Sequence, residues 1–183
     1  MAEPTMPSIA PLAAPDFEAF ASYLDDHLRD NGSALTGYFQ SQSRHQSGLP
    51  PERLLAFRQA LSVPLDEPGW RRAWVARTAD GCIIGHVDLR AHPQAHTSHR
   101  GLLGMGVDRA HRRQALGQAL LRHATQWARE EAGLAWLDLQ VLSHNLAAKA
   151  LYQREGFVQI GEIAAMFRID GQEMDYSLMA KRL

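Results

Sequence analysis

Residues 111–121, HRRQALGQALL, place two arginines and two small residues against the start of an amphipathic helix. Backbone N–H groups at a helix start have no partner inside the helix and converge on one region, so they can bind an anion. Ala115 and Gly117 allow a ligand to approach the backbone closely, and Arg112 or Arg113 could bind a phosphate in bidentate fashion. This combination is typical of a phosphate site. The alternative is a surface helix whose basic first turn opposes the helix dipole.

The stretch does not match the two common nucleotide-phosphate loops. A P-loop has a Lys-Ser/Thr pair after its second glycine, whereas Gly117 is followed by Gln118 and Ala119. A dinucleotide-binding loop needs Gly-x-Gly-x-x-Gly directly after a strand, and that spacing is absent. A nucleotide-binding protein that uses the same anion loop is therefore only a third interpretation.

The stretch resembles the acyl-CoA pyrophosphate loop of the GNAT family of N-acetyltransferases, whose pattern is Gln/Arg-x-x-Gly-x-Gly/Ala. Ala115 replaces the middle glycine, a change that is small in size but restricts φ. The resemblance implies that six consecutive residues bind pyrophosphate through their backbone amides. They are Arg112, Arg113, Gln114, Ala115, Leu116 and Gly117.

A second motif, SHNLAAKALYQREGF at residues 143–157, resembles the later motif of the same family. In that motif an Asn opens a helix, a Tyr follows seven residues later, and Gly-Phe closes the segment. One strand separates the two motifs, as the family pattern requires, and the resemblance extends over about residues 70–183. The matching residues are Asn145, Tyr152, Gly156 and Phe157.

The resemblance implies an acetyl-CoA-dependent N-acetyltransferase that moves an acetyl group by direct transfer to a primary amine of a small molecule or protein. The alternative is an acyl-CoA-binding sensor or structural module with little turnover. Acetyl-CoA would be the co-substrate. No metal is expected, because His92, His96 and His99 lie in a polar loop without a nearby cysteine. The residues that would contact the pantetheine arm, the first three by strand addition, are Met105, Gly106, Val107, Asn145 and Tyr152.

Direct transfer requires a base for the amine and a group that stabilises the leaving thiolate. The resemblance implies Tyr152 for the second role, because its hydroxyl can donate to sulfur. Many family members carry a Glu on the strand before the loop, but residues 102–107 contain no acid. Asp88 and His86 are the nearest alternatives, and their equal parity on the preceding strand predicts that they share a face. A base that acts through water, or no single base, is the other interpretation.

Apolar periodicity and turn residues predict the elements that position these groups. Asp-Gly pairs at 80–81 and 170–171 predict hairpins, and the strand–helix–strand unit at 101–142 predicts a locally parallel pair. We expect an α/β (α+β), single-domain GNAT-like fold, with a mixed central sheet of about six to seven strands flanked by about four helices. Strands are expected at 8–14, 71–79, 82–90, 101–108, 134–142, 157–169 and 173–183. Helices are expected at 16–30, 51–62 (with core positions Leu54, Leu55, Phe57 and Leu61), 116–131 and 145–155.

The 183-residue chain has an ordinary globular composition, with 45% hydrophobic and 21% charged residues. One domain over residues 7–183 is expected after a loose tail at 1–6. A net charge of −1 lacks the broad basic character of a nucleic-acid-binding protein. The single cysteine, Cys82, allows no intrachain disulfide, and neither a secretory signal nor a membrane segment is recognisable. We expect a cytoplasmic protein without nucleic-acid or membrane partners, and the resemblance leaves room for a homodimer.

Overall fold

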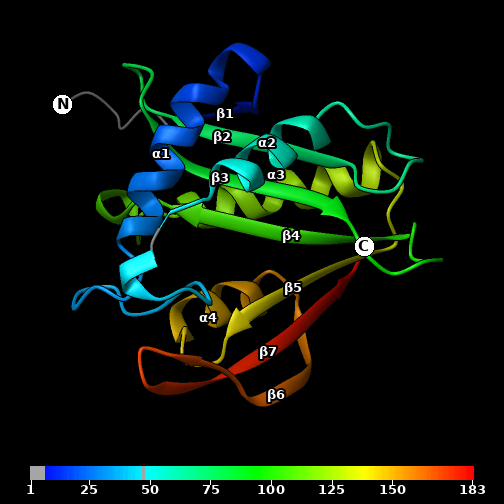
Figure 1. The fold of residues 1–183 in the computed structure, drawn as a ribbon. Coiled ribbons are helices and arrows are strands. Elements are labelled where there is room, and N and C mark those ends of the chain that lie inside the picture. The colour runs from blue at the N-terminus through cyan, green and yellow to red at the C-terminus, as the bar shows by residue number, and fades with distance from the viewer. Residues whose placement is uncertain (1–6, 47) are drawn as a thin grey trace.

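Within residues 7–46 and 48–183, which the computed structural model describes, seven strands form one mixed sheet in the order β1-β2-β3-β4-β5-β7-β6 (Figure 1). The tail expected at residues 1–6 lies outside the described residues. The strands are β1 (Ser8–Pro11), β2 (Arg71–Arg77), β3 (Ile83–Ala91), β4 (Arg100–Val107), β5 (Trp136–Leu142), β6 (Val158–Ile169) and β7 (Gln172–Arg182). The α-helices are α1 (Phe17–Arg29), α2 (Pro51–Ala60), α3 (Leu116–Glu130) and α4 (Leu146–Arg154). The expected mixed α/β architecture is confirmed.

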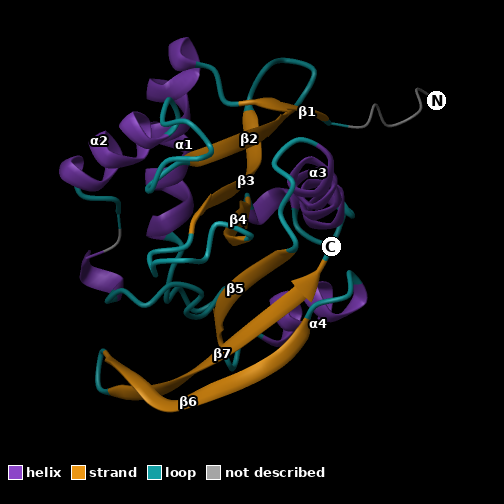
Figure 2. Ribbon diagram, turned by 90° about the vertical axis from the view of Figure 1, so that its right-hand side faces the viewer, coloured by secondary structure: helices purple, strands orange, loops and turns teal. Residues whose placement is uncertain are grey.

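The helices cover both faces of the sheet (Figure 2). On one face, α3 buries an apolar stripe that includes Leu120 and Ala124 against β2, β3 and β4. On the other face, α1 and α2 bury Phe20 and Phe57 against β2 and β3. The expectation that Leu55 lies in the core was wrong, because α2 reaches the sheet through Phe57 and leaves Leu55 56% exposed. None of the helices in residues 7–46 and 48–183 is long and apolar enough to cross a membrane.

The polar loop between α1 and α2 is organised by one buried side chain. Asn31 is fully buried, and its Oδ1 accepts hydrogen bonds from the backbone N–H groups of Phe39 and Gln40. Its Nδ2 donates to the carbonyl oxygen of Gln42. A short 3-10 helix at Arg44–Gln46 follows. The loop therefore has a defined conformation beside the sheet rather than being a simple connection.

The parallel pair that the sequence predicts is present, but it is short. β4 pairs with β5 only over Arg100–Leu102 and Trp136–Asp138. Beyond these residues β4 continues to pair with β3, and β5 continues to pair with β7, so the two halves of the sheet diverge (Figure 1). We call the region between residues 103–107 of β4 and 139–142 of β5 the strand opening.

Candidate active site

The strand opening exposes backbone in the middle of the sheet. Among the described residues, no ladder hydrogen bond joins β4 to β5 beyond Leu102 and Asp138. Gln140 is solvent-exposed although its strand lies between two others, and Met105 and Val107 are only half-buried. Unpaired N–H and C=O groups of this kind can pair with an extended ligand that has amide groups of its own.

The loop that the sequence singled out lies directly after β4 and forms the start of α3. Ala115 is the N-cap residue, with φ 61° and ψ 0°, and no side chain caps this helix end in the part of the chain that the structure describes. Arg113 also has a positive φ, of 60°, while Gln114 between them does not. Such alternation turns successive N–H groups toward one concave side, which is a recurring anion-binding arrangement. Residues 113–115 are exposed, so an anion can reach them.

Gly117 joins this loop to the strand opening. A Cβ at Gly117 would lie 3.1 Å from Leu151 Cδ2 on α4 and 3.5 Å from Met105 Cε on β4. The first turn of α3 therefore lies against both α4 and β4, and it approaches Leu151 so closely that a larger residue would displace that side chain. The loop and the strand opening are contiguous, as a single ligand with an anionic end and an extended arm would require.

The two arginines of the loop have different surroundings. The Arg112 guanidinium donates to the Val107 carbonyl oxygen at 3.2 Å, to Thr36 Oγ1 at 3.0 Å and to Asp30 Oδ2 at 3.0 Å. It thereby connects the loop to the α1–α2 segment and is not directed to a phosphate. Of the two side chains expected to bind phosphate, only the exposed Arg113 remains a candidate. The backbone N–H of Arg112 is not used by these contacts and remains a candidate donor.

α4 carries the two residues of the second motif. The Asn145 carboxamide oxygen accepts from the Ala148 N–H at 3.2 Å, so Asn145 caps α4. Tyr152 lies seven residues further along α4; it is 8% exposed, and its ring is 5.9 Å from that of Phe157. Burial raises the pKa of the Tyr152 phenol to about 12, so it is protonated at neutral pH. Among the described residues, its hydroxyl has no hydrogen-bond partner and is available to a ligand.

His86 and Asp88 lie on one face of β3, beneath α1, as their parity predicts. The His86 ring is 7% exposed, and its Nδ1 lies 3.2 Å from the hydroxyl of Tyr23 on α1. The Tyr23 hydroxyl also donates to the Gly106 carbonyl oxygen at 3.3 Å. Burial, assisted by the charge of Arg71, lowers the pKa of His86 to about 4. His86 is therefore a neutral, enclosed ring that holds Tyr23 against β4.

Asp88 is paired with two arginines that sequence reasoning did not single out. Its Oδ2 lies 3.3 Å from Arg71 Nε and 3.3 Å from Arg90 Nη1. Its other oxygen, Oδ1, is the atom that a Cβ at Gly104 would meet, at 2.7 Å. The parity that placed Asp88 beside His86 also places Arg90 on this face, so a signal for Arg90 was present in the sequence.

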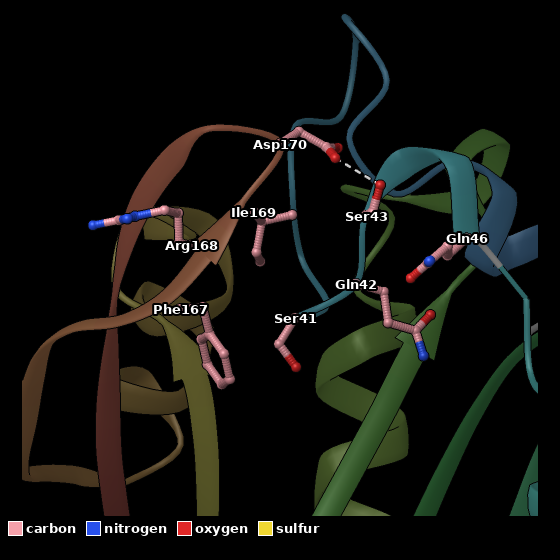
Figure 3. Close-up of a pocket in the computed structure, with 8 residues that line it drawn as sticks. All are labelled: Ser41, Gln42, Ser43, Gln46, Phe167, Arg168, Ile169 and Asp170. Carbon is pink, nitrogen blue, oxygen red and sulfur yellow. Dashed lines mark hydrogen bonds between the residues drawn. The ribbon is translucent and has the colours of Figure 1, made fainter.

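A cavity of about 410 Å³ lies between the α1–α2 loop and the β6–β7 hairpin (Figure 3). The Asp170 carboxylate accepts hydrogen bonds from the hydroxyls of Ser43 and Tyr38, both at 2.6 Å, and from the Arg44 N–H at 2.9 Å. These bonds hold the loop against the hairpin. The cavity is lined by Ser41, Gln42, Ser43, Gln46, Phe167, Arg168, Ile169 and Asp170.

A loop of uncapped amides, an adjoining gap in strand pairing and a buried phenol together match a fold class that binds acyl-CoA. Residues 34–157 match the model of the acetyltransferase (GNAT) family, and the chain belongs to that family. It is similar to the streptothricin acetyltransferase of Streptomyces lavendulae, with 34% identity over 110 residues. That alignment covers 58% of this chain and 55% of the relative, so the chain spans about half the length of this curated relative.

Solved structures reproduce the fold over nearly the whole chain. An acetyltransferase of the GNAT family from Streptococcus pneumoniae has a TM-score of 0.78 and 26% identity, with 97% of this chain and 99% of that chain covered. The structure of yncA from Salmonella typhimurium with its cofactor acetyl-CoA has a TM-score of 0.77 and 18% identity, with 97% and 94% covered. The second likeness concerns the fold alone.

Proposed function

We propose that this protein is an N-acetyltransferase that moves an acetyl group from acetyl-CoA to a primary amine, with acetyl-CoA bound along the loop and the strand opening. The observation that carries this proposal is their contiguity at Gly117. Backbone amides of residues 112–117 would bind the pyrophosphate, and the backbone of Met105, Gly106 and Val107 would pair with the pantetheine arm. Bound there, acetyl-CoA supplies an activated thioester. Its reacting end would then lie near Gly104, where β4 separates from β5.

Tyr152 would stabilise the leaving sulfur by donating a hydrogen bond. Its pKa of about 12 exceeds that of an ordinary thiol, about 8.5, so full proton transfer to a thiolate is unfavourable by about 5 kcal/mol. A donated hydrogen bond lowers the energy of the developing charge without that cost. Asn145, whose carboxamide oxygen caps α4, would present its amide N–H₂ to the pantetheine arm.

The amine must lose a proton before it attacks. Of the two candidate bases, His86 is enclosed under α1, whereas Asp88 turns Oδ1 toward Gly104. We assign deprotonation to water that passes the proton toward the Asp88 carboxylate, and we assign a positioning role to His86. Both residues already contact neighbouring side chains, His86 with Tyr23 and Asp88 with two arginines. This observation favours the second candidate function, a module that binds acyl-CoA with little turnover.

Two measurements on the full chain test the proposal. Coenzyme A should raise the melting temperature while ATP does not, and acetyl-CoA should release thiol only when a primary amine is present. The large side chain in Gly117→Trp would collide with Leu151, so this variant should lose both effects. Gln126→Trp, on the exposed side of the same helix, is the matched control and should retain them. Coenzyme A binding that survives Gly117→Trp would refute the assigned site, and binding without transfer to any amine would establish the module instead.

A further inference from the structure

A positive charge lies beside the point where β4 and β5 separate. Arg90 Nη1 is 3.3 Å from Asp88 Oδ2 and would be 3.2 Å from a Cβ placed on Gly104. The guanidinium therefore lies over the β4 backbone at the inner end of the strand opening. α3 covers the opposite face of this strand, so an acceptor must approach from the face that Arg90 occupies.

The charges around this point do not cancel. Arg71 is the second partner of Asp88, and its guanidinium stacks on the Phe57 ring at 4.1 Å. Two guanidinium groups thus share one oxygen of one carboxylate. Asp138, the nearest acid on β5, forms a bidentate pair with Arg100 and lies 3.9 Å from the His92 ring nitrogen Nε2. Around Asp88 the balance is one positive charge in excess.

Arg90 is also partly accessible to solvent. Its side chain is 36% exposed, and within residues 7–46 and 48–183 its only hydrogen bond is the one to Asp88. Burial raises the pKa of the Tyr176 phenol on β7, and the Arg90 charge opposes this rise. The Tyr176 ring packs on Phe167 with centroids 4.9 Å apart, and Phe167 lines the cavity. The Arg90 guanidinium therefore has unused donors that can be reached from solvent.

We infer that the acceptor is a primary amine that carries a carboxylate, as an amino acid does, and that Arg90 binds this carboxylate. The inference rests on the proposed function and names the substrate class of the same site. Arginine presents paired N–H donors that match the two oxygens of a carboxylate, and the local excess of positive charge disfavours a polycationic amine.

Matched amines test the inference with acetyl-CoA and the full chain. Phenylalanine should be acetylated with a kcat/KM at least about 30-fold above that of phenethylamine, which lacks only the carboxylate. Arg90→Gln should remove most of this preference, and Arg90→Lys should restore part of it. The two amines differ in basicity, but this difference affects wild type and variant alike. It therefore cancels when the preference of the variant is divided by that of wild type. Arg58→Gln, an exposed arginine of α2 paired with Glu18, is the matched control and should leave the preference unchanged.

Three results would overturn the inference. They are a preference for phenethylamine, a preference for the polyamine spermidine over amino acids, and an Arg90→Gln variant that lowers transfer to all amines equally. If no amine is acetylated, the proposed function fails, and binding decides the inference separately. In the presence of coenzyme A, N-acetylphenylalanine should bind more tightly than N-acetylphenethylamine by calorimetry. Arg90→Gln should weaken only the first, and equal binding of the two ligands would refute the role of Arg90.

Discussion

Ala115 stores conformational strain in the loop before α3, and Ala115→Gly should release it. Its φ of 61° lies in the left-handed region, where an L-residue with a Cβ is disfavoured by roughly 1–2 kcal/mol and glycine is not. Part of this gain is offset, because glycine loses more backbone entropy on folding. We expect a net stabilisation of about 1 kcal/mol, which for a chain of this size is a rise in melting temperature of about 2–4 °C.

Calorimetry or urea unfolding measures this change, and Gly133→Ala calibrates it. Gly133 follows the end of α3 with the same φ of 61°, and a Cβ there would have nothing within 4 Å. Gly133→Ala should lower the free energy of unfolding by about 1 kcal/mol, because alanine is disfavoured at this φ and glycine is not. The Kd for coenzyme A should change by less than about threefold in Ala115→Gly if the loop keeps this conformation when it binds. An unchanged melting temperature for Ala115→Gly, beside the expected loss in Gly133→Ala, would refute the strain argument.

Two further predictions concern buried titratable groups. Tyr152→Phe should lower kcat by roughly 10- to 150-fold, which corresponds to the loss of one hydrogen bond to a charged group. The ratio of wild-type to variant kcat should be constant over about pH 6–9, because the phenol stays protonated there. An unchanged kcat would show that Tyr152 has no role in catalysis. Burial lowers the pKa of His27 to about 3 and that of His86 to about 4, so between these values and about 6.5 the unfolded chain binds more protons than the folded one. The free energy of unfolding should therefore decrease as the pH is lowered below about 6.5, by about 2 kcal/mol per histidine at about pH 5. In urea titrations, His27→Phe should remove about half of this decrease. A variant with the same pH dependence as wild type would contradict the prediction.

The sequence predicted the order of elements because local rules govern it. Apolar periodicity distinguished helices from strands, and Asp-Gly turns located two hairpins. The loop at residues 112–117 was recognisable because its residues resemble a family pattern in which small residues stand at set positions. Asn145 was expected to open a helix, and it does so through its own side chain. Each of these inferences depends on residues within one or two turns of each other.

Long-range contacts decided the rest. Arg112 looked like a phosphate ligand, but its guanidinium binds Asp30 and Thr36, which lie more than seventy residues earlier in the chain. Arg90 shares the parity of Asp88, yet only the divergence of β4 from β5 places it beside the strand opening. The sequence by itself determined which segments form strands and helices. Where strand pairing stops, and which charges remain unmatched beside that point, is set by the packing of distant segments, which local periodicity does not encode.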